Sequence, residues 1–389
     1  MNKVNIDTKR TNYNTILTII KDHGPISRMG ILEYSKLSWG TVSATTSELY
    51  RLGLVQTYKD EHNQLGRNPD MFVVNDKDNL CLGIDINILG LVFLVCDISN
   101  KILTRRFVSL KSNIKDDILN QLEDNTKELI EEYKNIITIN ISMQGQIDTN
   151  KGISITAEHF KGWNNVEIKK FFEDKFNIRT FLYHDPDCLA TYHYSLNHNN
   201  LKSYSNSAII KLDEGIGMSL IIDNKLYSTI NGFSPEIGHN IVNPNGVMCN
   251  CGKRGCLEAY CSLLGLTARY NDSYNKTIDI PMFQKLLDSG DKDAIKILID
   301  NMKYLGYALA NLVNSIRPDI IIIDGMLSKY SHLFINIVDE TIKNTTDVNV
   351  LLGVANYNNE AAALGANVIT IDNNLTSIIF RDENENNKG

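Results

Sequence analysis

One histidine and three cysteines lie close together between residues 236 and 260, which read EIGHNIVNPNGVMCNCGKRGCLEAY. The possible ligands are His239, Cys249, Cys251 and Cys256. One imidazole and three thiolates satisfy a tetrahedral Cys3His zinc site of the structural kind, with no position left open. Gly252 and Gly255 separate the cysteines and would let the backbone wrap an ion closely. Unrelated core cysteines beside a histidine are the alternative, but the tight spacing favours structural zinc.

The other cysteines and the composition indicate a cytoplasmic globular protein. Seven cysteines are an odd total, and the four outside the cluster have no metal-binding spacing, so we expect free thiols rather than a disulfide framework. The chain of 389 residues is long enough for two or three domains. No apolar stretch typical of a signal peptide opens it. Residues 80–98 are the most apolar, but Asp85, Asn87 and Asp97 interrupt them, which predicts paired strands and no membrane contact.

The first 53 residues predict three short helices. Isoleucines recur at helical spacing within residues 12–22, and a Gly-Pro pair ends that helix. Ser27 is a suitable N-cap for a second helix at about 28–37. A short turn leads to a third helix at about 39–52, which Gly53 ends. Three short helices with tight connections are typical of a helix-turn-helix.

Two expected strands, LVQTY and MFVVN, flank the polar loop KDEHNQLGRNPD, as in a winged helix-turn-helix. Residues 1–75 carry nine Lys or Arg against seven Asp or Glu, whereas the whole chain has a net charge of −7, so DNA binding would be confined to this segment. A solvated Ser/Thr-rich face is the alternative for the third helix taken alone. The predicted DNA contacts are Ser38, Trp39, Thr41, Ser43, Thr45, Thr46 and Arg67.

From residue 76 onward, apolar strand-like segments alternate with helical ones, which predicts an α/β fold with a mixed sheet. Helices are expected at 114–134, 165–176 and 295–316. A strand–turn–strand opening occurs at 83–96 and again at 209–222. Two similar openings predict two lobes with a cleft between them.

The pattern E-x-x-H-x(9)-C-x-C-G-x-x-G-C-L-E resembles the signature of the ROK family (repressors, open reading frames and sugar kinases). The segments GPISR, LGRNP, GIDI and ISMQG resemble its repressor branch, which includes xylose and N-acetylglucosamine repressors. The resemblance implies an actin-like fold of two ribonuclease-H-like lobes. It implies a winged helix-turn-helix domain at 1–75 and a ROK sugar-binding domain at 76–389, with a smaller lobe at about 76–190 plus the C-terminal helix and a larger lobe at about 191–355.

The resemblance also implies a sugar site. The residues that match the family's sugar contacts are Asp185, Glu236, His239 and Glu258. In the family's kinases the aspartate corresponding to Asp185 takes a proton from the sugar, and the two nitrogens of His239 could serve the metal and a hydroxyl. Surface or capping roles are the alternative for the two glutamates. His184 and Pro235 stand where the family has Asn and Gly, which leaves the sugar's identity open.

Both phosphate-binding turns of the family's kinases are altered in this chain. Residues 85–89 read DINIL where those enzymes carry D-x-G-G-T, and residues 213–217 read DEGIG where they carry G-T-G-x-G. Phosphate binding needs closely approaching amides and positive charge. Asp213 and Glu214 would instead repel a phosphate, by about 4 kcal/mol per charge pair at about 4 Å. We therefore expect no ATP binding, no enzyme activity and no catalytic residue, with Asp185 kept as a sugar ligand.

These features predict a sugar-responsive repressor of a carbohydrate-utilisation operon. A homodimer, or a dimer of dimers, would place recognition helices in successive major grooves of operator DNA, with Arg67 in an A·T-rich minor groove. A monosaccharide or sugar phosphate would close the cleft and change operator affinity. Whether it induces or co-represses stays open.

Two alternatives come from other classes of protein. One is an ATP-dependent ROK sugar kinase with an atypical phosphate loop, which turnover of ATP with a sugar would reveal. The other is a zinc-stabilised protein whose N-terminal segment contacts another protein. A gel shift with the DNA upstream of its own gene would separate that alternative, and DNA binding that does not change with salt concentration would count against phosphate contacts.

Overall fold

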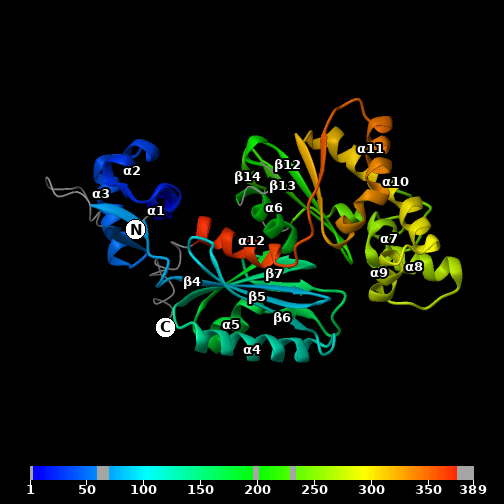
Figure 1. Cartoon of the computed structure of the whole chain (residues 1–389), viewed down its shortest axis with the longest axis horizontal. Coiled ribbons are helices and arrows are strands. Elements are labelled where there is room, and N and C mark those ends of the chain that lie inside the picture. Colours follow the sequence, from blue (N-terminus) through cyan, green and yellow to red (C-terminus); the bar gives the residue numbers. More distant parts are fainter. Residues whose placement is uncertain (1–2, 59–69, 196–200, 228–233, 375–389) are drawn as a thin grey trace. The chain divides into compact units, whose positions relative to one another are not determined.

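The computed structural model of the chain describes residues 3–58, 70–195, 201–227 and 234–374 (Figure 1). The chain divides into two compact units. The first comprises Met1–Gly145, Lys151–Tyr183 and Ala366–Gly389, and the second comprises Gln146–Asn150 and His184–Gly365. Among the residues described, no helix combines the length and the apolar character needed to span a membrane.

Three helices open the first unit: α1 (Lys3–His23), α2 (Arg28–Ser35) and α3 (Trp39–Arg51). The Ser27 hydroxyl caps α2 by accepting a hydrogen bond from a backbone N–H, as predicted. Gly53 follows α3 at φ +73°, a left-handed conformation that favours glycine, also as predicted. Helix α1 begins at Lys3 rather than near residue 12, and the mostly polar residues 3–11 gave too little apolar periodicity to predict this part of the helix.

Three short strands complete this N-terminal part: β1 (Ile26–Ser27), β2 (Val55–Tyr58) and β3 (Met71–Val74). They pair antiparallel in the order β1-β3-β2. The two expected strands that flank the polar loop are therefore confirmed. The loop itself, with Arg67, lies outside the described residues.

The core of this N-terminal part continues into the rest of the first unit. Cys81, Ile98 and Ile371 belong to the same buried cluster as the apolar residues of α1. The Lys21 ammonium group donates a hydrogen bond to Oδ1 of Asp372 at 2.5 Å. Helix α1 is thus packed against residues near the C-terminal end of the described chain.

A five-stranded sheet forms the centre of the first unit, in the order β11-β7-β4-β5-β6. Its strands are β4 (Leu80–Asn87), β5 (Gly90–Asp97), β6 (Ile102–Ser109), β7 (Ile136–Met143) and β11 (Arg179–His184). Helix α4 (Lys115–Glu132) runs along one face of the sheet (Figure 1). The smaller elements are β9 (Ile153–Thr156), β10 (Asn164–Val166), α5 (Ile168–Phe176) and the π-helical turn η4 (Thr370–Asn374).

A second five-stranded sheet lies in the second unit, in the order β14-β13-β12-β15-β16. Its strands are β12 (Ser207–Leu212), β13 (Ile216–Ile222), β14 (Lys225–Leu226), β15 (Ile320–Asp324) and β16 (Leu351–Val354). The α-helices of this unit are α6 (Asp185–Ser195), α7 (Glu258–Cys261), α8 (Leu263–Tyr274), α9 (Ile280–Asp288), α10 (Lys292–Ile316) and α11 (Ser331–Thr345). Helix α12 (Ala361–Ile369) begins in the second unit and ends in the first. The short elements are β8 (Gln146–Asp148), η1 (Leu201–Ser203), η2 (Ile237–His239) and η3 (Met326–Tyr330).

Both sheets open with the same pairing pattern. Strand β4 pairs antiparallel with β5 and parallel with β7. Strand β12 likewise pairs antiparallel with β13 and parallel with β15. The predicted α/β class and the two similar openings are therefore confirmed, and residues 80–98 form the predicted pair of strands.

Candidate functional site

The predicted metal ligands meet in the second unit, where His239 ends η2 and the three cysteines lie in the loop between η2 and α7. One ligand atom from each of His239, Cys249, Cys251 and Cys256 lies within 4.8 Å of all the others. The Sγ atoms of Cys251 and Cys256 are 3.7 Å apart. Gly255 has φ +77°, and a Cβ there would lie 1.8 Å from the carbonyl oxygen of Asn243. Glycine at this position therefore lets the loop close on itself.

This donor set fits a tetrahedral metal ion. Thiolates bound to zinc at about 2.3 Å lie roughly 3.8 Å apart on a tetrahedron. Nδ1 of His239 is buried and has no hydrogen-bond partner among the described residues, as expected for a nitrogen that faces an ion. Burial raises the pKa of Cys249 to about 12, so a bound metal would displace that thiol's proton. The four residues could hold a metal.

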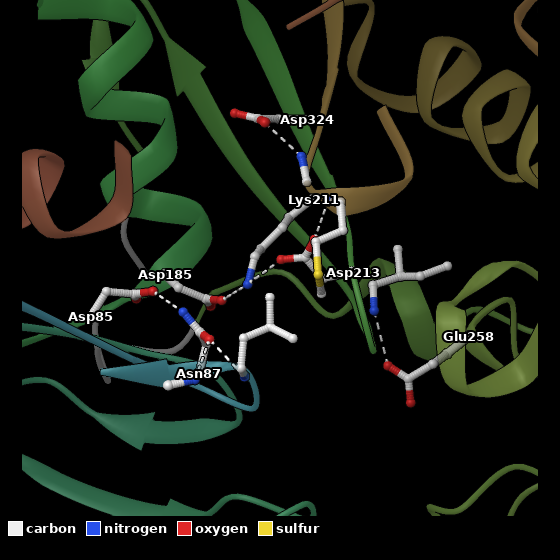
Figure 2. Close-up of polar contacts among 12 residues, drawn as sticks. Asp85, Asn87, Asp185, Lys211, Asp213, Glu258 and Asp324 are labelled. Carbon is white, nitrogen blue, oxygen red and sulfur yellow. Dashed lines mark hydrogen bonds and ion pairs between the residues drawn. The ribbon is translucent and has the colours of Figure 1, made fainter. Parts of the chain in front are cut away.

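The predicted sugar contacts surround the turn between β12 and β13. Oε2 of Glu258 accepts a hydrogen bond from the backbone N–H of Ile216 at 3.1 Å (Figure 2). A Cβ on Gly238 would lie 3.4 Å from the same Glu258 oxygen, so the segment that carries Glu236 and His239 packs here too. Glu236 itself is exposed at the start of η2.

Asp185 is the fourth predicted sugar contact and the first residue of α6. It is only 4% exposed. Its Oδ2 accepts a hydrogen bond from the ammonium group of Lys211 in β12, and the same ammonium group lies 2.8 Å from Oδ2 of Asp213 (Figure 2). Lys211 was not predicted from the sequence. The signal was present as a single lysine inside the apolar, strand-like segment SAIIKL.

The reason given above for excluding phosphate from this turn is wrong. Asp213 is paired with Lys211, and its Oδ1 accepts a hydrogen bond from the backbone N–H of Met326. Glu214 is buried, and burial raises its pKa to about 8, so the protonated form predominates near neutral pH. The turn therefore does not carry two unbalanced negative charges. The carboxylate of Asp213 is instead engaged with Lys211 and with the Met326 amide.

The turn between β4 and β5, in the first unit, is also closed by its own side chains. Oδ1 of Asn87 accepts hydrogen bonds from the backbone N–H groups of Leu89 at 2.9 Å and Gly90 at 3.2 Å. Nδ2 of Asn87 donates to Oδ2 of Asp85 at 2.7 Å (Figure 2). The amides of this turn are thus satisfied by an asparagine side chain, where a kinase of the family carries glycines.

Two further buried polar groups lie near Asp185. Asp187 accepts hydrogen bonds from the hydroxyls of Ser219 at 2.6 Å and Ser234 at 2.8 Å, and burial raises its pKa. Nε2 of His193 lies 2.7 Å from Oδ2 of Asp324. Neither group was predicted, because the partners are far apart in sequence and no local spacing signals them.

Six of the seven predicted DNA contacts lie among the described residues, at the N-cap or in α3, and they divide into three groups by exposure. Trp39 is 51% exposed, and Ser38 is exposed while its hydroxyl caps α3 by accepting from the N–H of Thr41. Thr41 and Ser43 are half-buried. The expectation that α3 exposes Thr45 and Thr46 is wrong, since they are 4% and 0% exposed. Both lie on the buried face of α3 together with Val42 and Leu49, so they cannot reach DNA.

Comparisons with known proteins agree with these features. The model of the ROK family matches residues 81–373. The xylose repressor of Bacillus spizizenii is 29% identical over 349 residues, which cover 86% of this chain and 87% of that protein.

Two solved structures share the fold to different extents. A ROK family transcriptional regulator, described as a homologue of the Escherichia coli MLC protein, is 20% identical and covers 96% of this chain and 99% of its own, with a TM-score of 0.82. A ROK family glucokinase from Streptomyces griseus is 21% identical and covers 74% of this chain and 97% of its own, with a TM-score of 0.64. With a family model that matches from β4 to the π-helical turn near the C-terminus, this chain belongs to the ROK family.

Proposed function

We propose that this chain is a cytoplasmic, sugar-responsive transcriptional repressor whose residues 1–75 form a winged helix-turn-helix. The observation that carries this proposal is the difference in coverage between the two solved structures. The glucokinase matches 74% of this chain, whereas the transcriptional regulator matches 96%. The additional coverage corresponds in extent to helices α1–α3 and the β2–β3 hairpin. A sugar-binding body with an added DNA-binding domain is the architecture that a sugar-dependent switch of operator affinity requires.

Helix α3 is the proposed recognition helix. Its first turn presents Trp39, and a homodimer would place two such helices in successive major grooves of a pseudo-palindromic operator. Arg67, in the polar loop between β2 and β3, is the proposed minor-groove contact. The N-terminal segment is mildly basic whereas the chain as a whole is acidic, which supports DNA binding by residues 1–75 and sugar binding by the rest of the chain.

Replacing Trp39 with alanine should weaken operator binding about tenfold without changing sugar affinity, because its exposed ring is available to a groove. Fluorescence anisotropy with DNA from upstream of the protein's own gene, at two salt concentrations, would measure this. Phe107→Ala is a matched control, since Phe107 is equally exposed but lies on β6. Unchanged operator affinity in Trp39→Ala would contradict the proposed orientation of α3.

The proposed effector is a monosaccharide or sugar phosphate bound by Asp185, Glu236, His239 and Glu258. Zinc, held by His239 and the three clustered cysteines, is the proposed structural cofactor. Zinc fixes the conformation of the loop, and His239 would present its second nitrogen to a sugar hydroxyl. Sugar binding then favours the conformation that has the weaker, or the stronger, affinity for the operator.

A sugar kinase is the second candidate, favoured by the fold that the chain shares with the glucokinase. We expect no phosphorylated sugar from incubation with ATP, Mg²⁺ and xylose, glucose or N-acetylglucosamine. The reason is that Asn87 engages the backbone amides of its own turn, which a phosphate would need, and Asp213 accepts from the backbone N–H of Met326. The Streptomyces griseus glucokinase would serve as the positive control with glucose. Any turnover by this chain would contradict its assignment as a non-enzyme.

A further inference from the structure

Lys211 is the cation at the centre of the buried polar cluster in the second unit. Strand β12 is buried along its whole length, and the Lys211 side chain is 11% exposed. An ammonium group in such a place is costly unless carboxylates surround it. Figure 2 shows the side chain extending from β12 toward Asp185 and Asp213, which supply those carboxylates. These ion pairs therefore connect α6, β12 and the β12–β13 turn.

The two carboxylates are anchored to different degrees. Asp213 has two anchors, since its Oδ2 pairs with Lys211 and its Oδ1 accepts from the backbone N–H of Met326. For the Asp185 side chain, the polar partner found within the described parts of the chain is Lys211. The orientation of Asp185 therefore depends on Lys211, whereas that of Asp213 depends on it only in part.

The charges around Lys211 show what would happen to Asp185 if the ammonium group were removed. The Lys211 ammonium group lies between the carboxylates of Asp185 and Asp213 and pairs with both. Without the ammonium group, Asp185 would face Asp213 with no intervening positive charge. Like charges in a buried site repel strongly, so Asp185 would turn away or take up a proton. Either change removes a carboxylate acceptor from the sugar site.

We propose that Lys211 is a positioning residue of the sugar site, whose ammonium group holds the Asp185 carboxylate where it accepts a hydrogen bond from a sugar hydroxyl. This inference rests on the sugar-binding function proposed above. Lys211 contacts Asp185 and does not itself contact the sugar. Its position on β12 places the positive charge between Asp185 and the β12–β13 turn, which in the family's kinases holds phosphate.

The test uses the full-length, zinc-loaded chain and four variants. Lys211→Met removes the charge, and Lys211→Met combined with Asp213→Asn removes the charge together with its second partner, which keeps the cluster balanced. Lys211→Arg keeps a cation, and Lys225→Met is the control, because Lys225 is exposed on β14 of the same sheet. Calorimetric titration with D-xylose, and in parallel with D-glucose and N-acetyl-D-glucosamine, gives the affinity, and thermal unfolding reports the integrity of the fold.

We expect the double variant to unfold near the wild-type temperature but to bind the sugar at least about tenfold more weakly, with Lys211→Arg recovering part of the loss. The Lys225→Met control should match the wild type. A folded double variant with wild-type affinity would overturn the positioning role while leaving the proposed function intact. A wild-type chain that binds none of the three sugars would instead contradict the proposed function, and this inference with it.

Discussion

Replacing Cys256 with serine should remove the metal and abolish the response of operator binding to sugar. The four ligand atoms of the wild-type site lie within 4.8 Å of one another. A serine hydroxyl is a poor zinc ligand, so only three effective ligands would remain. Cys256 is fully buried and lies two residues before Glu258, so the loop that carries the proposed sugar contacts loses its anchor. Zinc content, measured by elemental analysis, should fall from about one ion per chain to near zero.

Cys261→Ser provides the matched control. Cys261 is also fully buried, but it is not one of the clustered ligands, and its Sγ donates to the carbonyl oxygen of Asn301 at 3.2 Å. A serine hydroxyl can keep that hydrogen bond, so this variant should retain both zinc and the sugar response. A Cys256→Ser protein that has lost zinc but responds to sugar like the wild type would show that the metal has no part in the switch.

Replacing Asp185 with asparagine should lower sugar affinity about 100-fold while leaving operator affinity in the absence of sugar unchanged. Hydrogen bonds to a charged acceptor contribute about 1.5–3 kcal/mol, which corresponds to roughly 10- to 150-fold in binding. The amide fills the same volume, and Lys211 keeps its ion pair with Asp213, so the fold should survive. Calorimetry with the sugar and anisotropy with operator DNA would separate the two affinities.

Asp339→Asn is a suitable comparison for that variant. Asp339 pairs with Lys343 at 2.6 Å on the surface of α11, where Lys343 is exposed and Asp339 partly exposed, so its loss should change neither affinity. If Asp185→Asn bound the sugar as tightly as Asp339→Asn, Asp185 would have no role as a sugar ligand.

Local patterns predicted the elements that depend on short stretches of sequence. The three N-terminal helices, the two strands on either side of the polar loop and the β4–β5 pair all carry caps, turns or apolar periodicity within a few residues. The four clustered ligands could be predicted for the same reason, since three of them lie within eight residues. Each of these features is determined by residues that lie close together in the sequence.

The errors arise where polarity was given more weight than position. Thr45 and Thr46 are polar, but they lie between Val42 and Leu49, which are seven residues apart and define the buried face of α3. The acidic turn was treated as two free charges although Lys211, which pairs with Asp213, lies only two residues earlier on β12 and on the same side of the strand. The Met326 amide and the burial that raises the pKa of Glu214 depend on segments far away in the sequence, so their effect on the turn could not be predicted.

The shared core between α1 and the remainder of the first unit has a consequence for protein engineering. Cys81, Ile98 and Ile371 belong to the buried cluster that contains the apolar residues of α1. Residues 1–75 therefore cannot be transferred to another protein without losing part of their core. A chimera that joins this segment to the body of another regulator would leave part of α1 without its apolar neighbours, and Lys21 without Asp372. Transplanting the operator specificity of this protein therefore calls for exchanging only the outward side chains of α3, or for carrying strand β4 and the C-terminal turn along with the graft.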